Sequence, residues 1–220
     1  MQRKTIILTF DDALRNHLEF VAPILKKYNF GATFYVCEFP DAQNFGESPY
    51  LNWRQIAELS GMGFEIGNHT KSHCDCRKIS RQDFLAELTY IEEKCREHAI
   101  APPRTFAYPG GPVAENVIGI LKERGYVTAR SCGDTTFDPQ RDDPFRVMGV
   151  PVQDNTGNKF FEAVQRATDS AYTVLVFHGV PDLPHPWVNT EPARFEACME
   201  YLAEQNCRVI PMREIFTAGQ

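Results

Sequence analysis

The chain has 220 residues, of which 43% are apolar and 24% are charged, and its formal net charge is −6. This composition is typical of a soluble globular domain with a substantial core, and the acidic balance argues against nucleic acid as the main partner. No apolar run is long enough to span a membrane, so we expect no membrane partner. The seven cysteines lack regular spacing, which predicts reduced thiols in a cytoplasmic protein. A predicted strand begins directly after residue 3, so we expect no signal peptide.

Short apolar strands alternate with helix-like segments along the chain. Strands are expected at residues 4–10, 32–37, 63–68, 104–107, 126–130, 145–148, 173–177 and 208–210. Helices are expected at residues 16–28, 53–60, 80–98, 114–124, 159–170 and 193–204. This order, with nearly continuous apolar strands, predicts an α/β fold in which helices cover a parallel sheet. The number of strands favours a closed or nearly closed barrel, as a single domain over residues 1–220.

Three irregular stretches are rich in Pro, Gly, Asp and Asn: residues 39–51, 131–144 and 179–192. Loops of this kind shape the ligand cleft of a barrel enzyme, whose active site lies at the carboxyl ends of the strands. The polar motifs described below follow predicted strands. The sequence therefore predicts one domain with one site.

Two carboxylates and two imidazoles could form a metal site. Asp11 and Asp12 end the first strand, where adjacent ionised side chains repel each other unless a cation lies beside them. Asp12, His69 and His73 would supply three ligands and leave open positions for water and substrate, as catalytic zinc requires. The His-x-x-x-His spacing predicts that both imidazoles lie on one face of a helical turn. Such pairs are also common on exposed helices, so the argument depends on the aspartates.

Asp11 and His178 are the candidate proton-transfer residues. A divalent cation lowers the pKa of bound water from about 15.7 towards 7 and polarises a carbonyl oxygen. Asp11 would take the proton of the attacking water. His178 ends a buried strand and precedes a glycine, where it could protonate a leaving amine. The structural alternatives are an N-cap for Asp11 and a histidine satisfied by backbone groups for His178.

The tight turn at Tyr108, Pro109 and Gly110 could present backbone N–H groups to a ligand and stabilise an oxyanion, although a plain turn fits equally well. Trp187, Phe137 and Tyr108 are candidate platforms for stacking against a sugar ring. Three arginines near predicted strands could pair with Asp11: Arg104, Arg130 and Arg146. His17 and His98 fall in predicted helices, and we expect them on the surface.

These motifs resemble those of the polysaccharide deacetylase family, carbohydrate esterase family 4, whose domain is also called the NodB homology domain. The segment Thr9-Phe10-Asp11-Asp12 is similar to the first motif, in which the first Asp is the catalytic base and the second binds the metal. The segment from His69 to His73 is similar to the second motif, with both histidines on the metal. Residues 106–111 resemble the third motif, which implies an oxyanion N–H at Gly110, and residues 175–178 resemble the last, whose histidine is the catalytic acid.

The resemblance implies a deformed (β/α)₇ barrel and one divalent cation, zinc before cobalt, nickel or manganese. The sequence also departs from the family pattern. Many members carry an arginine in the third motif that braces the catalytic Asp, and Ala107 stands at that position. The Asp-Trp type fourth motif, which supports the catalytic histidine, has no clear counterpart, and Asp134 and Asp138 are possible substitutes. These departures, together with the expected absence of a secretion signal, point away from a cell-wall polymer and towards a soluble N-acetylated sugar or oligosaccharide, or a related amide.

Three functions remain open on these residues. The first is a metal-dependent hydrolase of a non-peptide C–N bond that deacetylates an N-acetylated sugar. The second is a hydrolase of a small cyclic amide or ureide, a chemistry found among relatives of the family. The third is a catalytically silent carbohydrate- or protein-binding domain, against which the retention of Asp11, Asp12, His69, His73 and His178 counts.

Overall fold

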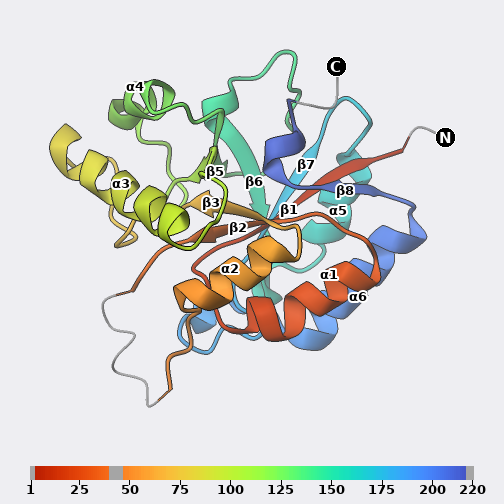
Figure 1. Ribbon diagram of the computed structural model, residues 1–220. Helices are drawn as coiled ribbons and strands as arrows, with labels where there is room; N and C mark the ends of the chain where they lie inside the picture. The colour runs from red at the N-terminus through yellow and green to blue at the C-terminus, as the bar shows by residue number, and fades with distance from the viewer. Residues whose placement is uncertain (1–2, 40–46, 217–220) are drawn as a thin grey trace.

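A computed structural model describes residues 3–39 and 47–216, and Figure 1 shows a central parallel sheet surrounded by helices. The strands are β1 (Thr5–Phe10), β2 (Thr33–Val36), β3 (Glu65–Asn68), β4 (Thr105–Ala107), β5 (Thr128–Cys132), β6 (Val147–Pro151), β7 (Thr173–Phe177) and β8 (Arg208–Ile210). The α-helices are α1 (Ala22–Lys27), α2 (Trp53–Gly61), α3 (Arg81–Glu97), α4 (Glu115–Glu123), α5 (Lys159–Arg166) and α6 (Pro192–Glu204). Every predicted strand and helix overlaps one of these elements. Among the described helices, none is long and apolar enough to cross a membrane.

Seven strands close a barrel, and the eighth distorts it. The sheet order is β2-β3-β4-β5-β6-β7-β1-β8, and an additional β1–β2 pairing closes the ring. Only the last residues of β1, Thr9 and Phe10, pair with β2, because β8 pairs with the first half of β1. Strand β8 also contacts the segment that leads into β2, since the Gly31 N–H donates a hydrogen bond to the Val209 carbonyl of β8 at 3.1 Å. The predicted deformed (β/α)₇ barrel is therefore confirmed.

The alternation of side chains along β1 separates two cores. Ile6, Leu8 and Phe10 point outward and pack beneath the helices, where Phe10 stacks on the rings of Phe34 and Phe177. Ile7 points inward and belongs to the small cluster that fills the barrel. Because strand side chains alternate with a period of two, Asp11 continues the inward row of Ile7 and emerges at the carboxyl end of the barrel.

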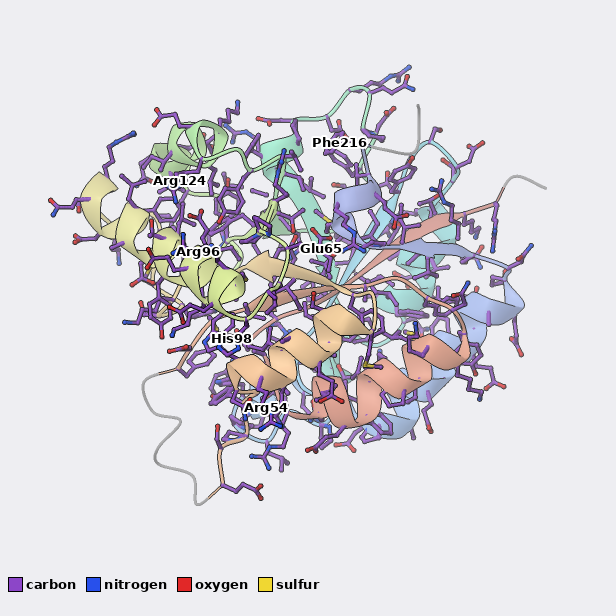
Figure 2. The ribbon with its side chains drawn as sticks, in the orientation of Figure 1. Arg54, Glu65, Arg96, His98, Arg124 and Phe216 are labelled. Carbon is purple, nitrogen blue, oxygen red and sulfur yellow. The ribbon has the colours of Figure 1, made fainter. Side chains whose placement is uncertain are left out.

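The opposite end of the barrel is closed by a buried carboxylate, Glu65 at the start of β3 (Figure 2). Its oxygens accept hydrogen bonds from the hydroxyls of Thr33 and Thr105, at 2.7 and 2.9 Å, and from the Arg213 backbone N–H at 2.8 Å. Burial raises the pKa of Glu65, and these donors oppose that effect. The network ties the segment after β8 to the base of the barrel and leaves the carboxyl ends of the strands free for a site.

Candidate metal centre and cleft

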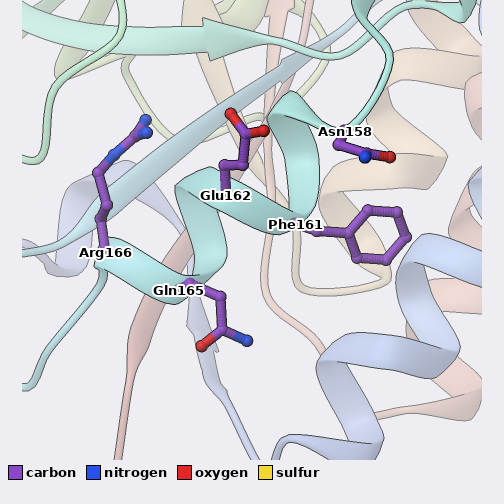
Figure 3. A pocket seen from close by; sticks show the side chains of 5 residues that line it. All are labelled: Asn158, Phe161, Glu162, Gln165 and Arg166. Atoms are coloured by element: carbon purple, nitrogen blue, oxygen red, sulfur yellow. The ribbon is translucent and has the colours of Figure 1, made fainter.

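Two hollows of similar volume lie on different parts of the molecule. One of about 610 Å³ runs along the exposed side of α5 and is lined by Asn158, Phe161, Glu162, Gln165 and Arg166 (Figure 3). The other, of about 640 Å³, lies at the carboxyl ends of the strands and contains Asp11, Asp12, His69, His73 and His178. Among the described residues, only Asp12, His69 and His73 bring three potential metal-ligand atoms within 4.8 Å of one another, and all three line this second hollow. The second hollow is therefore the candidate site.

Asp12, His69 and His73 converge on one point, as the sequence predicted. The Nε2 atoms of His69 and His73 lie 3.7 and 3.8 Å from Asp12 Oδ1. Two ligands of a tetrahedral zinc ion, each about 2.1 Å from it, are about 3.4 Å apart. The three side chains could therefore hold a divalent cation with little rearrangement. Asp12 has a φ of 74°, which non-glycine residues rarely adopt, and such backbone conformations cluster at ligand sites.

His69 is prepared as a ligand by its surroundings. The Ala107 carbonyl accepts a hydrogen bond from Nδ1 at 2.8 Å, which leaves the lone pair of Nε2 directed at Asp12. Burial lowers the pKa of His69 to about 4, the neighbouring carboxylates oppose this effect, and the ring is neutral at pH 7. A backbone carbonyl that fixes the tautomer of a ligating histidine is a common feature of metal sites.

The histidine pair does not lie on a helical turn, so that expectation was wrong. Residues 69–73 form an irregular loop after β3, and both Thr70 and His73 have positive φ, at 62° and 52°. Glu87 of α3 holds the loop, since its carboxylate accepts hydrogen bonds from the Ser72 N–H and hydroxyl at 2.7 and 3.0 Å. The loop brings the imidazoles together through a reversal of the backbone rather than through helical periodicity.

Asp11 is braced by Arg130, one of the three arginines that the sequence offered. The Arg130 Nη2 contacts both Asp11 oxygens, at 2.6 and 2.5 Å, and neither side chain is appreciably exposed. Burial raises the pKa of Asp11, but the charge and hydrogen bond of Arg130, together with the neighbouring histidines, outweigh burial and lower the pKa to about 2. Arg130 is the register partner of Ala107 on the neighbouring strand, so the brace comes from β5. Arg146 instead pairs with Glu115 at the surface.

His178 faces the same carboxylate from β7, with Nε2 3.9 Å from Asp11 Oδ2. Its carbonyl accepts a hydrogen bond from Nε2 of His17 at 3.0 Å. His17 is fully buried, so its expected place on the surface was wrong. The buried Nδ1 of His178 has no hydrogen-bond partner among the described residues. Asp134 is not that partner, because it is exposed and pairs with Arg166. Asp138 is not the partner either, because its carboxylate accepts a hydrogen bond from the Gln140 N–H and pairs with Arg141 in its own loop.

In the turn after β4, the glycines line the cleft but the tyrosine does not. Gly110 and Gly111 line the cleft and have positive φ, at 69° and 94°. Tyr108 is 1% exposed and its hydroxyl donates to the Phe145 carbonyl at 3.0 Å, so it cannot stack against a sugar. Pro109 is also buried.

Phe137, another predicted stacking platform, is likewise buried and packs against Tyr172 in the barrel cluster. Trp187 is 67% exposed and lines the cleft, so of the three candidate platforms it alone is placed to contact a ligand. Phe39, the first residue of the predicted loop 39–51, also lines the cleft, whereas residues 40–46 lie outside the described part of the chain.

Two further residues lie near the metal ligands: Cys37, which the sequence did not single out, and His185, which was expected only as part of a loop lining the cleft. The Cys37 thiol donates to Asp12 Oδ1 at 3.7 Å, and His185 Nδ1 lies 3.9 Å from Asp12 Oδ2. Cys37 directly follows β2, the strand that closes the barrel against β1. Its position after an apolar strand beside the one that carries the aspartates was the available signal.

Comparisons with known proteins agree with this geometry. The family model described as "Polysaccharide deacetylase" matches residues 1–129. A peptidoglycan-N-acetylglucosamine deacetylase from Bacillus cereus is 32% identical over 130 residues, covering 57% of this chain and 55% of the relative. The chain spans about half the length of the curated relatives it matches.

Solved structures show the same fold. A peptidoglycan N-acetylglucosamine deacetylase has a TM-score of 0.70 at 18% identity, covering 97% of this chain and 88% of that one. A carbohydrate esterase family 4 pseudoenzyme from Bacillus anthracis has a TM-score of 0.66 at 20% identity, covering 97% and 65%. At 18% and 20% identity, these two structures support the fold assignment alone. Because the family model matches more than half of the sequence, the chain belongs to the polysaccharide deacetylase family.

Proposed function

We propose that this protein is a metal-dependent hydrolase that removes the acetyl group from an N-acetylated sugar or oligosaccharide. The observation that carries the proposal is the meeting of a three-ligand cation site with a buried, ionised carboxylate in one cleft. Ligand sets of two histidines and a carboxylate with open positions suit a catalytic rather than a structural ion. The family relationship supports the same reaction.

Asp12, His69 and His73 would hold the cation, which when bound lowers the pKa of water and polarises a carbonyl oxygen. Asp11 accepts the proton of the attacking water, because Arg130 keeps its carboxylate ionised at neutral pH. The low pKa makes Asp11 a weak base, so it depends on the increased acidity of the water. The Gly110 N–H, in the turn that lines the cleft, would stabilise the oxyanion, and His178 would protonate the leaving amine.

The cleft supports a sugar of limited length as the substrate. Its volume of about 640 Å³ is in the range of small-molecule sites. Trp187 offers an exposed aromatic face at its edge, as sugar-binding sites commonly do. The relative from Bacillus cereus is named for N-acetylglucosamine in peptidoglycan, which supports an N-acetylated hexosamine as the reacting unit.

The second candidate is a silent binding domain. The Bacillus anthracis pseudoenzyme has this fold. The local observation that favours a silent domain is the buried Nδ1 of His178, which has no hydrogen-bond partner within residues 3–39 and 47–216. The retention of both proton-transfer residues and all three ligands in one cleft opposes it.

The first experiment measures metal in protein purified without chelators, beside a His69→Ala/His73→Ala variant. We expect about one equivalent of zinc or a similar ion, lost in the variant. Acetate release from N-acetylglucosamine oligomers is then compared between the wild type and Asp11→Asn, which should bind metal normally and show no turnover. Protein that takes up no metal even after incubation with zinc would overturn the proposal, and normal turnover by Asp11→Asn would refute the role of Asp11.

A further inference from the structure

The loop between β7 and α6 is built around one buried carboxylate. Asp182 is 1% exposed and accepts hydrogen bonds from the backbone N–H groups of Gly179 and His185, at 2.9 and 2.8 Å. Its own N–H donates to the side chain of Asn189 at 2.6 Å. These bonds fix the backbone of the loop beside the cleft without using any part of the His185 side chain.

The His185 imidazole lies between the Asp182 and Asp12 carboxylates. Its Nδ1 is 3.4 Å from Asp182 Oδ1 and 3.9 Å from Asp12 Oδ2. Its Nε2 is 3.3 Å from the Tyr50 hydroxyl. An Nδ1 that faces two carboxylates is the donor nitrogen of the ring, and Nε2 then accepts from Tyr50. The ring also packs against Phe39, with centroids 5.0 Å apart.

The two oxygens of Asp12 face different partners. Oδ1 faces His69 and His73, whereas Oδ2 faces His185. A cation held by the three ligands would approach from the Oδ1 side. The side chain that faces Oδ2 can then decide whether the carboxylate presents Oδ1 to the histidines or rotates away from them.

We propose that His185, held in place by Asp182, is a positioning residue that orients Asp12 and thereby sets the affinity of the site for its cation. Outer partners of metal-ligating carboxylates typically contribute about 10- to 100-fold to metal affinity. The inference rests on the proposed function only in requiring that the cleft binds a cation. It concerns a residue that lies outside the four motifs and that no comparison assigns.

The test is the dissociation constant for Zn²⁺, measured on metal-free protein by competition with a chromophoric chelator. His185→Phe keeps a ring but removes both nitrogens, and we expect binding about 10- to 100-fold weaker. His185→Asn places an amide nitrogen near the position of Nδ1, and we expect affinity within a few-fold of the wild type. Leu183→Ala is the loop control, since Leu183 is 80% exposed, and it should bind zinc as the wild type does.

The outcomes separate this inference from the proposed function. A wild type that binds no zinc overturns the proposed function and, with it, the present inference. A wild type that binds zinc beside an equally tight His185→Phe variant overturns only the role of His185. Equal loss in His185→Asn and His185→Phe, or a comparable loss in Leu183→Ala, assigns the effect to loop packing and also overturns it. Thermal unfolding of each metal-free variant identifies any variant that fails to fold. If His185→Phe does not fold, the zinc affinity of His185→Asn is compared with that of Asp182→Asn. Weaker zinc binding by Asp182→Asn alone supports the inference, and equal affinity of the two variants refutes it.

Discussion

Replacing Arg130 with methionine should expose how the barrel keeps a carboxylate ionised in its interior. Arg130 is fully buried, and Nη2 contacts both oxygens of Asp11. Methionine has a similar length but no charge. The change leaves Asp11 buried without a cationic side chain in contact, and removing one partner of a buried ion pair typically costs about 3–5 kcal/mol.

The dependence of this cost on pH distinguishes the ion pair from simple packing. In the wild type, the pKa of Asp11 is lowered from 3.8 to about 2, which corresponds to about 2 kcal/mol of stability. That stability is present above pH 3.8 and is lost as the pH falls towards 2. In Arg130→Met burial remains and its main counterweight is gone, so we expect the pKa of Asp11 to rise above 3.8 even though His69 and His178 still favour the ionised form. The variant should then lose stability relative to the wild type as the pH increases above 4.

Urea unfolding of both proteins between pH 4 and pH 8, with metal removed by a chelator, measures the effect. The difference in unfolding free energy should grow with pH and reach about 3–5 kcal/mol near neutrality. The double variant Asp11→Asn/Arg130→Met removes both charges and should recover much of this loss. A difference below about 1 kcal/mol that does not change with pH would refute the reasoning.

Three further predictions concern other parts of the molecule. A Cβ at Gly149 would lie 2.9 Å from Cδ of Arg130, so Gly149→Ala should lower the unfolding free energy by about 1–3 kcal/mol. A Cβ at Gly119 would meet nothing within 4 Å, so Gly119→Ala in α4 should raise the unfolding free energy by about 0.5–1 kcal/mol. The opposite order of stabilities in urea unfolding would contradict this prediction. Burial lowers the pKa of His17 from 6.5 to about 4, so stability falls as the pH drops below 6.5, by about 2 kcal/mol between pH 7 and pH 5; a His17→Gln variant with an equal acid loss would show that other groups cause it. Trp187→Ala should raise KM for an N-acetylated oligosaccharide about 5-fold and leave kcat nearly unchanged, and a fall in kcat alone would argue against a binding role.

The strands and helices could be predicted because their apolar periodicity is local. Residues 173–177 and 208–210 were predicted with the bounds that the structure shows. The distortion of the barrel could not be predicted in the same way. It depends on which half of β1 pairs with β8 and which with β2, and pairing between residues so distant in the chain leaves no periodic signal in either segment.

The metal ligands could be predicted from residue type and strand order, but their local backbone could not. A spacing of four residues fits a helical turn, yet the His69–His73 loop uses positive φ at Thr70 and His73 instead. His17 was assigned to the surface because it falls in a predicted helix. The structure buries it between Phe10 and Phe34 because its Nε2 finds a partner in the His178 carbonyl, a contact between residues 161 positions apart.

The brace of Asp11 shows why position in the barrel matters more than position in a motif. The resemblance led us to look for an arginine at Ala107 on β4, but the guanidinium comes from Arg130, its register partner on β5. A large side chain can enter the barrel at this level because its neighbours are small: Ala107 carries only a methyl group, and Gly149 leaves the space that the Arg130 side chain fills. An arginine on either strand can therefore reach the same carboxylate. The absence of a motif residue in the sequence thus says little about the absence of its charge in the cleft, and the Arg130→Met variant tests that charge directly.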